Sequence, residues 1–178
     1  MPTDITVFGA GTVIFIDGIA AAVALALLLY RKPGSTIFRW TVAAVLTLLL
    51  SFLGAQLAAA LYNDPRPFVL GHYRPLIAHA ADNGFPSDHS LLAAAIVAMV
   101  AFARWLWTVP FVLLGGIVEV ARVGAGLHHP IDVIGSDVVV GIAAVLAAVL
   151  APGTARRLLP YVPTRLLNLV AAPDNTGA

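Results

Sequence analysis

The segment PIDVIGSDVVVGIAAVLAAVL, from Pro130 to Leu150, decides the fold class of this chain. Its only charged residues are Asp132 and Asp137, and about 20 apolar residues are enough for a helix to cross the hydrocarbon core of a bilayer. Pro130 suits the first position of such a helix, because the N–H that proline lacks would have no intrahelical partner there. We therefore expect a transmembrane helix from 130 to about 150.

The rest of the chain is equally apolar, which indicates an integral membrane protein. Hydrophobic residues make up 60% of the 178 and charged residues 11%, with a mean hydropathy of +0.94, whereas roughly a quarter of a soluble domain is charged. Four further apolar segments lie at about 5–30, 36–62, 87–102 and 108–127. The sequence predicts one all-α domain over residues 1–178, a polytopic bundle of five transmembrane helices.

Two regions between and beyond these segments have weaker signals. We expect a short interfacial helix near 75–81, in the polar loop that follows the second segment. After Pro152 and Gly153, three arginines lie among leucines in 154–170, a pattern typical of an amphipathic helix on the membrane surface. We expect this tail to lie on the surface, with a sixth span as the alternative.

The distribution of basic residues predicts the orientation of the bundle. With five spans, seven of the ten basic residues fall on one side, and the positive-inside rule assigns that side to the cytoplasm. The other three are Arg66, Arg74 and Arg122. Two polar regions, 64–90 and 119–137, then lie at the opposite face, which is periplasmic or extracellular. Ionisable groups in a membrane protein are costly, so their convergence on one face predicts a functional site.

The polar residues of this face are suited to binding a phosphate. Arg66 and Arg122 carry planar guanidinium groups that match phosphate oxygens. Two predicted helices begin at the same face, near Ser87 and Pro130, and a helix N-terminus offers free N–H groups and a partial positive charge. The chain has no cysteine, so a thiolate nucleophile is excluded.

The histidines of this face suggest phosphoryl transfer. His128 and Asp132 are spaced i, i+4, which places a carboxylate beside an imidazole at a helix start and leaves the other ring nitrogen free to attack phosphorus. His89, on a different helix, is then available to protonate the leaving group. We expect a phosphohistidine on His128 that water hydrolyses. No metal or other cofactor is required, because arginines and helix ends can stabilise the transition state.

These residues also carry a resemblance to a known family. The motifs resemble the three-part signature of the type 2 phosphatidic-acid phosphatase family, and the stretch from Pro65 to Ser90 resembles its bacitracin-resistance branch, the undecaprenyl-diphosphate phosphatases. The matching positions are Arg66-Pro67, Pro86-Ser87-Asp88-His89, and Arg122 followed by His128 and Asp132.

The resemblance implies specific roles for these positions. His128 would be the nucleophile, Asp132 its partner and His89 the general acid. The phosphate would be bound by Arg66, Ser87 and Arg122, together with Asp88, which agrees with the bacitracin-resistance branch. Two positions depart from the family pattern: Ala59 stands where a lysine is usual and Ala121 where a serine is usual. Either one phosphate contact is lost, or Arg74 or another donor supplies it from the loop.

Several polar residues remain with two interpretations each. His129 follows the proposed nucleophile but has no aspartate at i+4, so we expect it to be a helix-entry residue. His79 either supports the site, like Arg74, or belongs to a solvated loop. Glu119 lies one turn from Arg122 and is expected to hold its side chain in an ion pair. Asp17 and Asp137 are each either a polar link between helices or part of a proton path.

The predicted function follows from the site and from the resemblance. We expect a lipid phosphatase in the cell membrane that converts undecaprenyl diphosphate to undecaprenyl phosphate, the carrier lipid of cell-wall synthesis, with no nucleic-acid partner. One alternative is the same chemistry on phosphatidylglycerol phosphate, phosphatidic acid or a decaprenyl phosphosugar. The other is a transporter that binds a lipid phosphate without cleaving it, which would need the arginines but not the His128–Asp132 pair.

Overall fold

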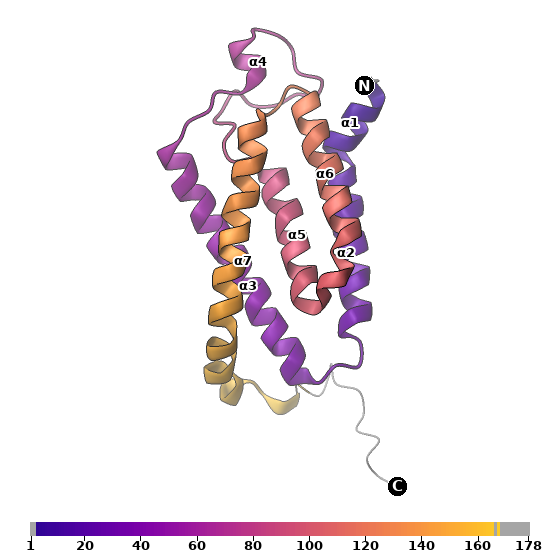
Figure 1. Cartoon of the computed structure of the whole chain (residues 1–178), viewed down its shortest axis with the longest axis vertical. Coiled ribbons are helices and arrows are strands. Elements are labelled where there is room, and N and C mark those ends of the chain that lie inside the picture. The colour runs from indigo at the N-terminus through magenta and orange to yellow at the C-terminus, as the bar shows by residue number, and fades with distance from the viewer. Residues whose placement is uncertain (1–2, 166, 168–178) are drawn as a thin grey trace.

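The computed structural model describes residues 3–165 and 167, and the part it describes is helical without strands (Figure 1). A single isolated β-bridge joins Pro65 and Asn83. The α-helices are α1 (Thr3–Gly11), α2 (Val13–Leu29), α3 (Gly34–Leu61), α4 (Pro67–Leu70), α5 (Asp88–Arg104), α6 (Val109–Gly124) and α7 (Pro130–Leu158). Two short 3-10 helices, η1 (Trp105–Trp107) and η2 (Leu159–Tyr161), follow α5 and α7.

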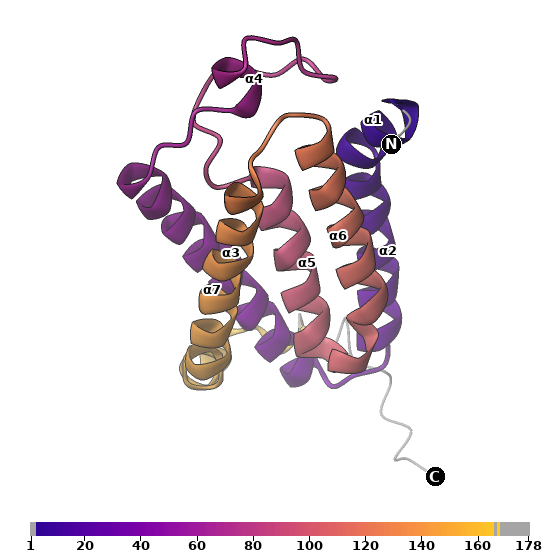
Figure 2. The ribbon, with the colours of Figure 1, turned by 45° about the horizontal axis from the view of Figure 1, so that its top comes forward.

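The long helices form a bundle around α5, which packs against α2, α3, α6 and α7. Around this centre, α3 packs along α7, and α1 and α2 pack against α6. The loop that carries α4 arches over one end of the bundle, above the start of α7 and the end of α6 (Figure 2). The predicted polar regions therefore meet at one end of a helical bundle.

The buried and exposed residues have the pattern of a protein surrounded by lipid. Alanines dominate the buried core, whereas many leucines, valines and phenylalanines are exposed on the outside of the bundle. Small residues let helices approach closely where lipid tails, being as apolar as leucine, give little drive for burying large side chains. The prediction of an all-α polytopic membrane bundle is confirmed.

The number of spans that the helices support differs from the predicted five. Among the described residues, α3, α5 with η1, and α7 with η2 are long and apolar enough to cross a membrane, and the α1–α2 pair, bent by 43°, adds a fourth if it is one span. All five predicted segments are helical, but α6 has only 16 residues. At 1.5 Å per residue it is about 24 Å long, less than the ~30 Å hydrocarbon core.

Two predicted boundaries are wrong. The short helix is α4, at Pro67–Leu70 rather than 75–81, and it starts where Pro67 occupies its first turn. Helix α7 continues through Pro152 to Leu158, because the buried Ala151 and Ala155 prolong its packing beyond the proline. The first part of the predicted tail thus belongs to α7, and positions 166 and 168–170 of it lie outside the described residues.

Candidate active site

Five polar side chains are buried together at the end of the bundle beneath the α4 loop. Each comes from a different position in the fold: the loop before α4, the N-cap of α5, the last turn of α6, the α6–α7 connection and the first turn of α7. They are Arg66, Ser87, Arg122, His128 and Asp132. The structure therefore brings together the residues that three separate motifs predicted, in a core that is otherwise mostly alanine.

The ring of His128 is held on both sides by partners that define its protonation. Its Nδ1 lies 3.0 Å from the carbonyl oxygen of Gly84 and 3.3 Å from Oδ2 of Asp132. Its Nε2 lies 3.1 Å from Nη1 of Arg66 and 3.3 Å from Nη2 of Arg122. Guanidinium nitrogens only donate, so Nε2 must accept and Nδ1 must carry the proton. The lone pair of Nε2 thus faces the two arginines.

Both arginines are anchored by further hydrogen bonds besides those to His128. Arg66 donates from Nε to Asp82 Oδ1 at 2.7 Å and from Nη1 to the Leu127 carbonyl at 3.1 Å, and the bond from Arg66 lowers the pKa of the Asp82 carboxyl. Arg122 donates from Nη1 to the Ala10 carbonyl at 3.2 Å. Two cations that converge on one imidazole repel each other, and an anion between them would relieve that repulsion.

The Ala10 carbonyl that anchors Arg122 is free because α1 and α2 are two helices rather than one. In a straight helix this carbonyl would accept from the N–H four residues later. At the 43° bend the bonds from Thr12 to Phe8 and from Ile16 to Thr12 are kept, but among the described residues no backbone N–H of α2 donates to the Ala10 carbonyl. The bend therefore supplies the site with a backbone acceptor.

His79 belongs to the site, which the sequence left open. Its Nε2 lies 3.4 Å from Nη2 of Arg122, and its ring centroid is 6.4 Å from that of His128. Burial, and next the charge of Arg66, lower the pKa of His79 below its usual value. A neutral imidazole can accept a hydrogen bond from Arg122, so the lowered pKa is consistent with this contact.

The N-termini of α5 and α7 are tied together by serines. Ser87 caps α5, where its Oγ accepts from the N–H of Ser90 at 3.5 Å. The N–H of Ser87 donates to the Asp132 carbonyl at 3.3 Å, and Ser136 Oγ donates to the Ser87 carbonyl at 3.0 Å. Both positive helix ends thus sit at the same buried site. Ser136 was not predicted as a site residue. Its i+4 spacing from Asp132 is the sequence pattern that could have indicated that it lies on the same helix face.

The remaining predicted residues lie at the edge of the site or outside it. His89 is half-buried in the first turn of α5, near enough to Arg122 for its positive charge to act on it. Asp88 is exposed beside it. Arg74 is exposed and forms no hydrogen bond or ion pair with the described residues. At position 59, where the family pattern has a lysine, the backbone carbonyl of Ala59 accepts a hydrogen bond from Asn83 Nδ2.

The expected ion pair between Glu119 and Arg122 is wrong. Glu119 faces Asp137 of α7, with which it lines one cavity, whereas Arg122 extends toward Ala10 and His128. The two side chains of α6 thus serve different neighbours. Asp17 of α2 is fully buried, and neither of its carboxyl oxygens has a hydrogen-bond partner among the described residues.

Glu119 and Asp137 line a cavity of about 320 Å³ between α5, α6 and α7. It begins one helical turn from the site, since Glu119 is three residues from Arg122 and Ala93 is four from His89. The other lining residues are mostly small and apolar: Ala93, Ala94, Val97, Ala98, Val112, Gly115, Gly116, Val140, Gly141 and Ala144.

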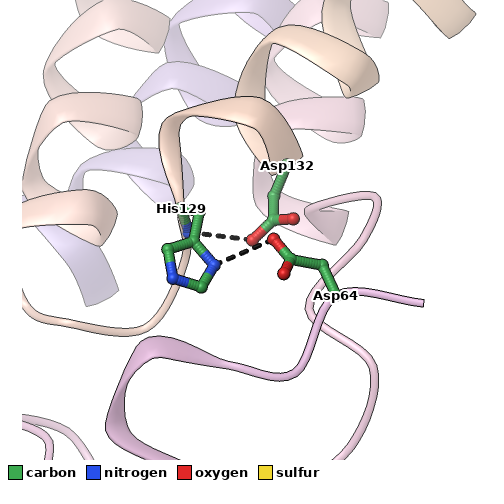
Figure 3. Close-up of side chains that lie close together, drawn as sticks. All are labelled: Asp64, His129 and Asp132. Carbon is green, nitrogen blue, oxygen red and sulfur yellow. Dashed lines mark hydrogen bonds and ion pairs between the residues drawn. The ribbon is translucent and has the colours of Figure 1, made fainter. Parts of the chain in front are cut away.

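A second histidine–carboxylate cluster adjoins His128 (Figure 3). Ligand atoms of Asp64, His129 and Asp132 lie within 4.8 Å of one another, and such a donor set can hold a metal ion. His129, however, donates its N–H to Asp132 Oδ2 at 2.9 Å, and its Nδ1 contacts Asp64 Oδ2 at 2.8 Å. Hydrogen bonding within the cluster therefore accounts for its geometry without a metal.

Comparisons with known proteins agree with the motifs. Residues 40–157 match the model of the PAP2 superfamily. Undecaprenyl-diphosphatase BcrC of Bacillus subtilis (strain 168) is 42% identical over 83 residues, 47% of this chain and 43% of that protein. Bacitracin transport permease protein BcrC of Bacillus licheniformis is 32% identical over 116 residues, 62% and 55% of the two chains. The chain thus spans about half the length of these curated relatives.

A solved structure shares the fold. The crystal structure of Aquifex aeolicus LpxE superposes with a TM-score of 0.54 over 82% of each chain, at 22% sequence identity. The helical bundle is therefore common to the two chains.

Proposed function

Because this chain belongs to the PAP2 superfamily, the family that its motifs predicted, we propose that it is a membrane lipid phosphatase that converts undecaprenyl diphosphate to undecaprenyl phosphate. The observation that carries the proposal is the environment of His128, whose unprotonated Nε2 faces two buried arginines. An arginine pair alone would serve binding. A ring nitrogen with a free lone pair, beside a carboxylate that fixes the tautomer, is suited to attack on phosphorus.

In the proposed reaction the terminal phosphate displaces the contacts of Nε2 with the arginines and is bound by Arg66, Arg122 and the N-terminus of α5. Nε2 of His128 attacks the terminal phosphorus, and the bond to the bridging oxygen breaks. His89 gives its proton to that oxygen, so undecaprenyl phosphate leaves. The charge that develops on the His128 ring is stabilised at Nδ1 by Asp132 and the Gly84 carbonyl.

The second half of the reaction regenerates the enzyme. Water attacks the phosphorus of the phosphohistidine while His89, now neutral, takes a proton from it. The bond between phosphorus and Nε2 breaks, and inorganic phosphate is released. His128 returns to the neutral tautomer in which Nδ1 carries the proton. Every proton and phosphoryl group is thus accounted for by two histidines, water and the substrate.

The cavity between α5, α6 and α7 supports a lipid substrate. Its volume of about 320 Å³ is within the range of ligand pockets, and its wall of small apolar residues adjoins the phosphate site on the same three helices. We propose that the isoprene units after the first lie there while the diphosphate is bound above. On the predicted orientation, the site faces the outer leaflet, so the substrate need not leave the membrane.

A transporter is the second candidate, since one relative carries the printed name of a transport permease. The full chain, purified in detergent with a chelator present, distinguishes the two. We expect phosphate to be released faster from undecaprenyl diphosphate than from phosphatidic acid, and the rate to be unchanged by the chelator. Binding of lipid phosphates without any release would favour the transporter, and loss of activity with the chelator would contradict the metal-free mechanism.

Filling the cavity tests where the lipid chain lies. A Cβ added to Gly116 or Gly141 meets no atom within 4 Å, so leucine can be introduced at either position without a clash at Cβ. We expect Gly116→Leu and Gly141→Leu to raise the KM for undecaprenyl diphosphate roughly tenfold, as the loss of one or two apolar contacts does. The KM for a short-chain prenyl diphosphate with a single isoprene unit should stay unchanged, because that chain does not reach the cavity.

The matched control for these variants is Gly153→Leu. Gly153 lies on the same helix as Gly141 and is equally open, but it is near the opposite end of the bundle and does not line the cavity. Kinetics on both substrates for the three variants give the comparison. An equal loss with long and short chains, or an equal loss in Gly153→Leu, would place the lipid elsewhere.

A further inference from the structure

The pair formed by His129 and Asp64 touches the proposed catalytic dyad, although neither residue belongs to the reaction described above. Nδ1 of His129 lies 2.8 Å from Asp64 Oδ2, and its backbone N–H donates to Asp132 Oδ2 at 2.9 Å (Figure 3). The same Asp132 oxygen lies 3.3 Å from Nδ1 of His128. His129 therefore contacts two carboxylates, one of which is the partner of His128.

The two carboxylates lie close enough to disturb each other. Ligand oxygens of Asp64 and Asp132 are within 4.8 Å, and both side chains are poorly exposed, at 13% and 0%. Two ionised carboxylates at this spacing, away from water, repel each other. The His129 imidazole donates from Nδ1 to Asp64 Oδ2. The backbone N–H of His129 is one of two groups that contact Asp132 Oδ2, and Nδ1 of His128 is the other.

Asp64 also reaches the second acceptor of His128. Its carbonyl accepts from the N–H of Gly84 at 2.8 Å, and its N–H donates to Asn83 Oδ1 at 2.9 Å. The Gly84 carbonyl is the other acceptor of His128 Nδ1. A Cβ on Gly84 would come within 3.0 Å of Asp132 Oδ2 and 3.1 Å of the Asp64 carbonyl. Asp64 thus packs against both groups that hold the ring of His128.

We infer that His129 is a positioning residue: by pairing with the Asp64 carboxylate it keeps the Asp132 carboxylate ionised and directed at His128. The inference rests on the proposed function. The His129 imidazole is hydrogen-bonded to the Asp64 carboxylate. Asp132 therefore faces His128 without an unpaired negative charge beside it. His129 touches no reacting atom and acts through Asp132 alone.

The test compares three variants of the full chain: His129→Phe, Asp64→Asn, and the double variant. Phenylalanine keeps the size of the ring but leaves Asp64 unpaired beside Asp132. We expect kcat to fall roughly 10–100-fold with KM within about twofold, the range typical of groups that orient a catalytic ligand. Asp64→Asn removes the charge and keeps an acceptor for His129, so kcat should stay within about threefold of the wild type.

The double variant decides between charge and simple packing. With no charge at position 64, loss of the imidazole should matter little, and kcat should recover to within about threefold of Asp64→Asn. A structural defect from the phenylalanine would not be repaired in this way. Asp4→Asn, at an exposed aspartate of α1, is the control for the amide substitution, and thermal unfolding of each variant reports stability separately.

Three results would overturn the inference: wild-type kcat in His129→Phe, a double variant as slow as His129→Phe, or stimulation by added Zn²⁺ that requires His129 and Asp64. A readout without turnover separates this inference from the proposed function. In ¹⁵N spectra of histidine-labelled protein, the His128 ring nitrogens should shift in His129→Phe and return in the double variant. That pattern can hold even if the wild type cleaves no lipid, in which case the proposed function alone fails.

Discussion

Phosphate release by His128→Gln is expected to fall at least roughly 10⁴-fold, the loss found when a nucleophile is removed. Glutamine can place its amide oxygen near the position of Nε2 and accept from Arg66 and Arg122, which now contact that nitrogen at 3.1 and 3.3 Å. It cannot be phosphorylated in turn. The variant should therefore still bind undecaprenyl diphosphate, and it should lose kcat rather than affinity.

Rapid acid and alkaline quenching of the reaction adds a direct measurement. The wild type should accumulate a protein-bound phosphate that survives alkali and is lost in acid, as expected of a phosphohistidine, and His128→Gln should not form it. His72→Asn is the control: His72 is an exposed loop residue with a φ of 51°, a conformation that asparagine tolerates. Residual turnover by His128→Gln at a tenth of the wild-type rate would exclude His128 as the nucleophile.

Arg122→Lys is expected to lower kcat/KM by about 10²–10³, the usual effect of removing one donor from a transition-state binding site. Because lysine keeps the positive charge, this loss would report the fixed directions of the guanidinium hydrogen bonds rather than the charge. One arm of the guanidinium donates to the Ala10 carbonyl and the other points at His128 and His79. A lysine ammonium is a single point charge on a flexible stem and cannot make both sets of contacts in fixed directions.

Arg74→Lys is the matched control, because Arg74 is an exposed arginine in the loop over the same end of the bundle. It should keep wild-type kcat/KM with undecaprenyl diphosphate. Inhibition by vanadate, which mimics a phosphoryl group in transfer, should weaken in Arg122→Lys and not in Arg74→Lys. The opposite ranking would mean that Arg74, rather than Arg122, supplies the phosphate contact in place of the lysine that is absent at position 59.

The sequence predicted the helices and the central site residues because both depend on short spacings. Apolar segments of about 20 residues report spans directly, and the i, i+4 spacing of His128 and Asp132 reports a contact within one helical turn. Positive-inside counting then placed Arg66, Ser87 and His89 at the same end. None of these predictions depends on how one helix is rotated against another.

The contacts that the sequence did not predict join residues distant along the chain. Asp64 and His129 are 65 residues apart and His79 and Arg122 are 43 apart, so no local pattern pairs them. Glu119 was paired with Arg122 on spacing alone, but the rotation of α6 turns Glu119 toward Asp137. The bend between α1 and α2 was missed for a related reason, since the apolar composition is continuous across it.

Because of that bend, an acceptor at the beginning of the chain belongs to a site whose other residues are synthesised much later. The Ala10 carbonyl and Arg122, which it holds, are separated by 112 positions, and α7 must follow before Asp132 is in place. During synthesis the acceptor enters the membrane long before its donor exists. On the proposed mechanism, activity can therefore arise only after α6 and α7 have packed against the helices made before them.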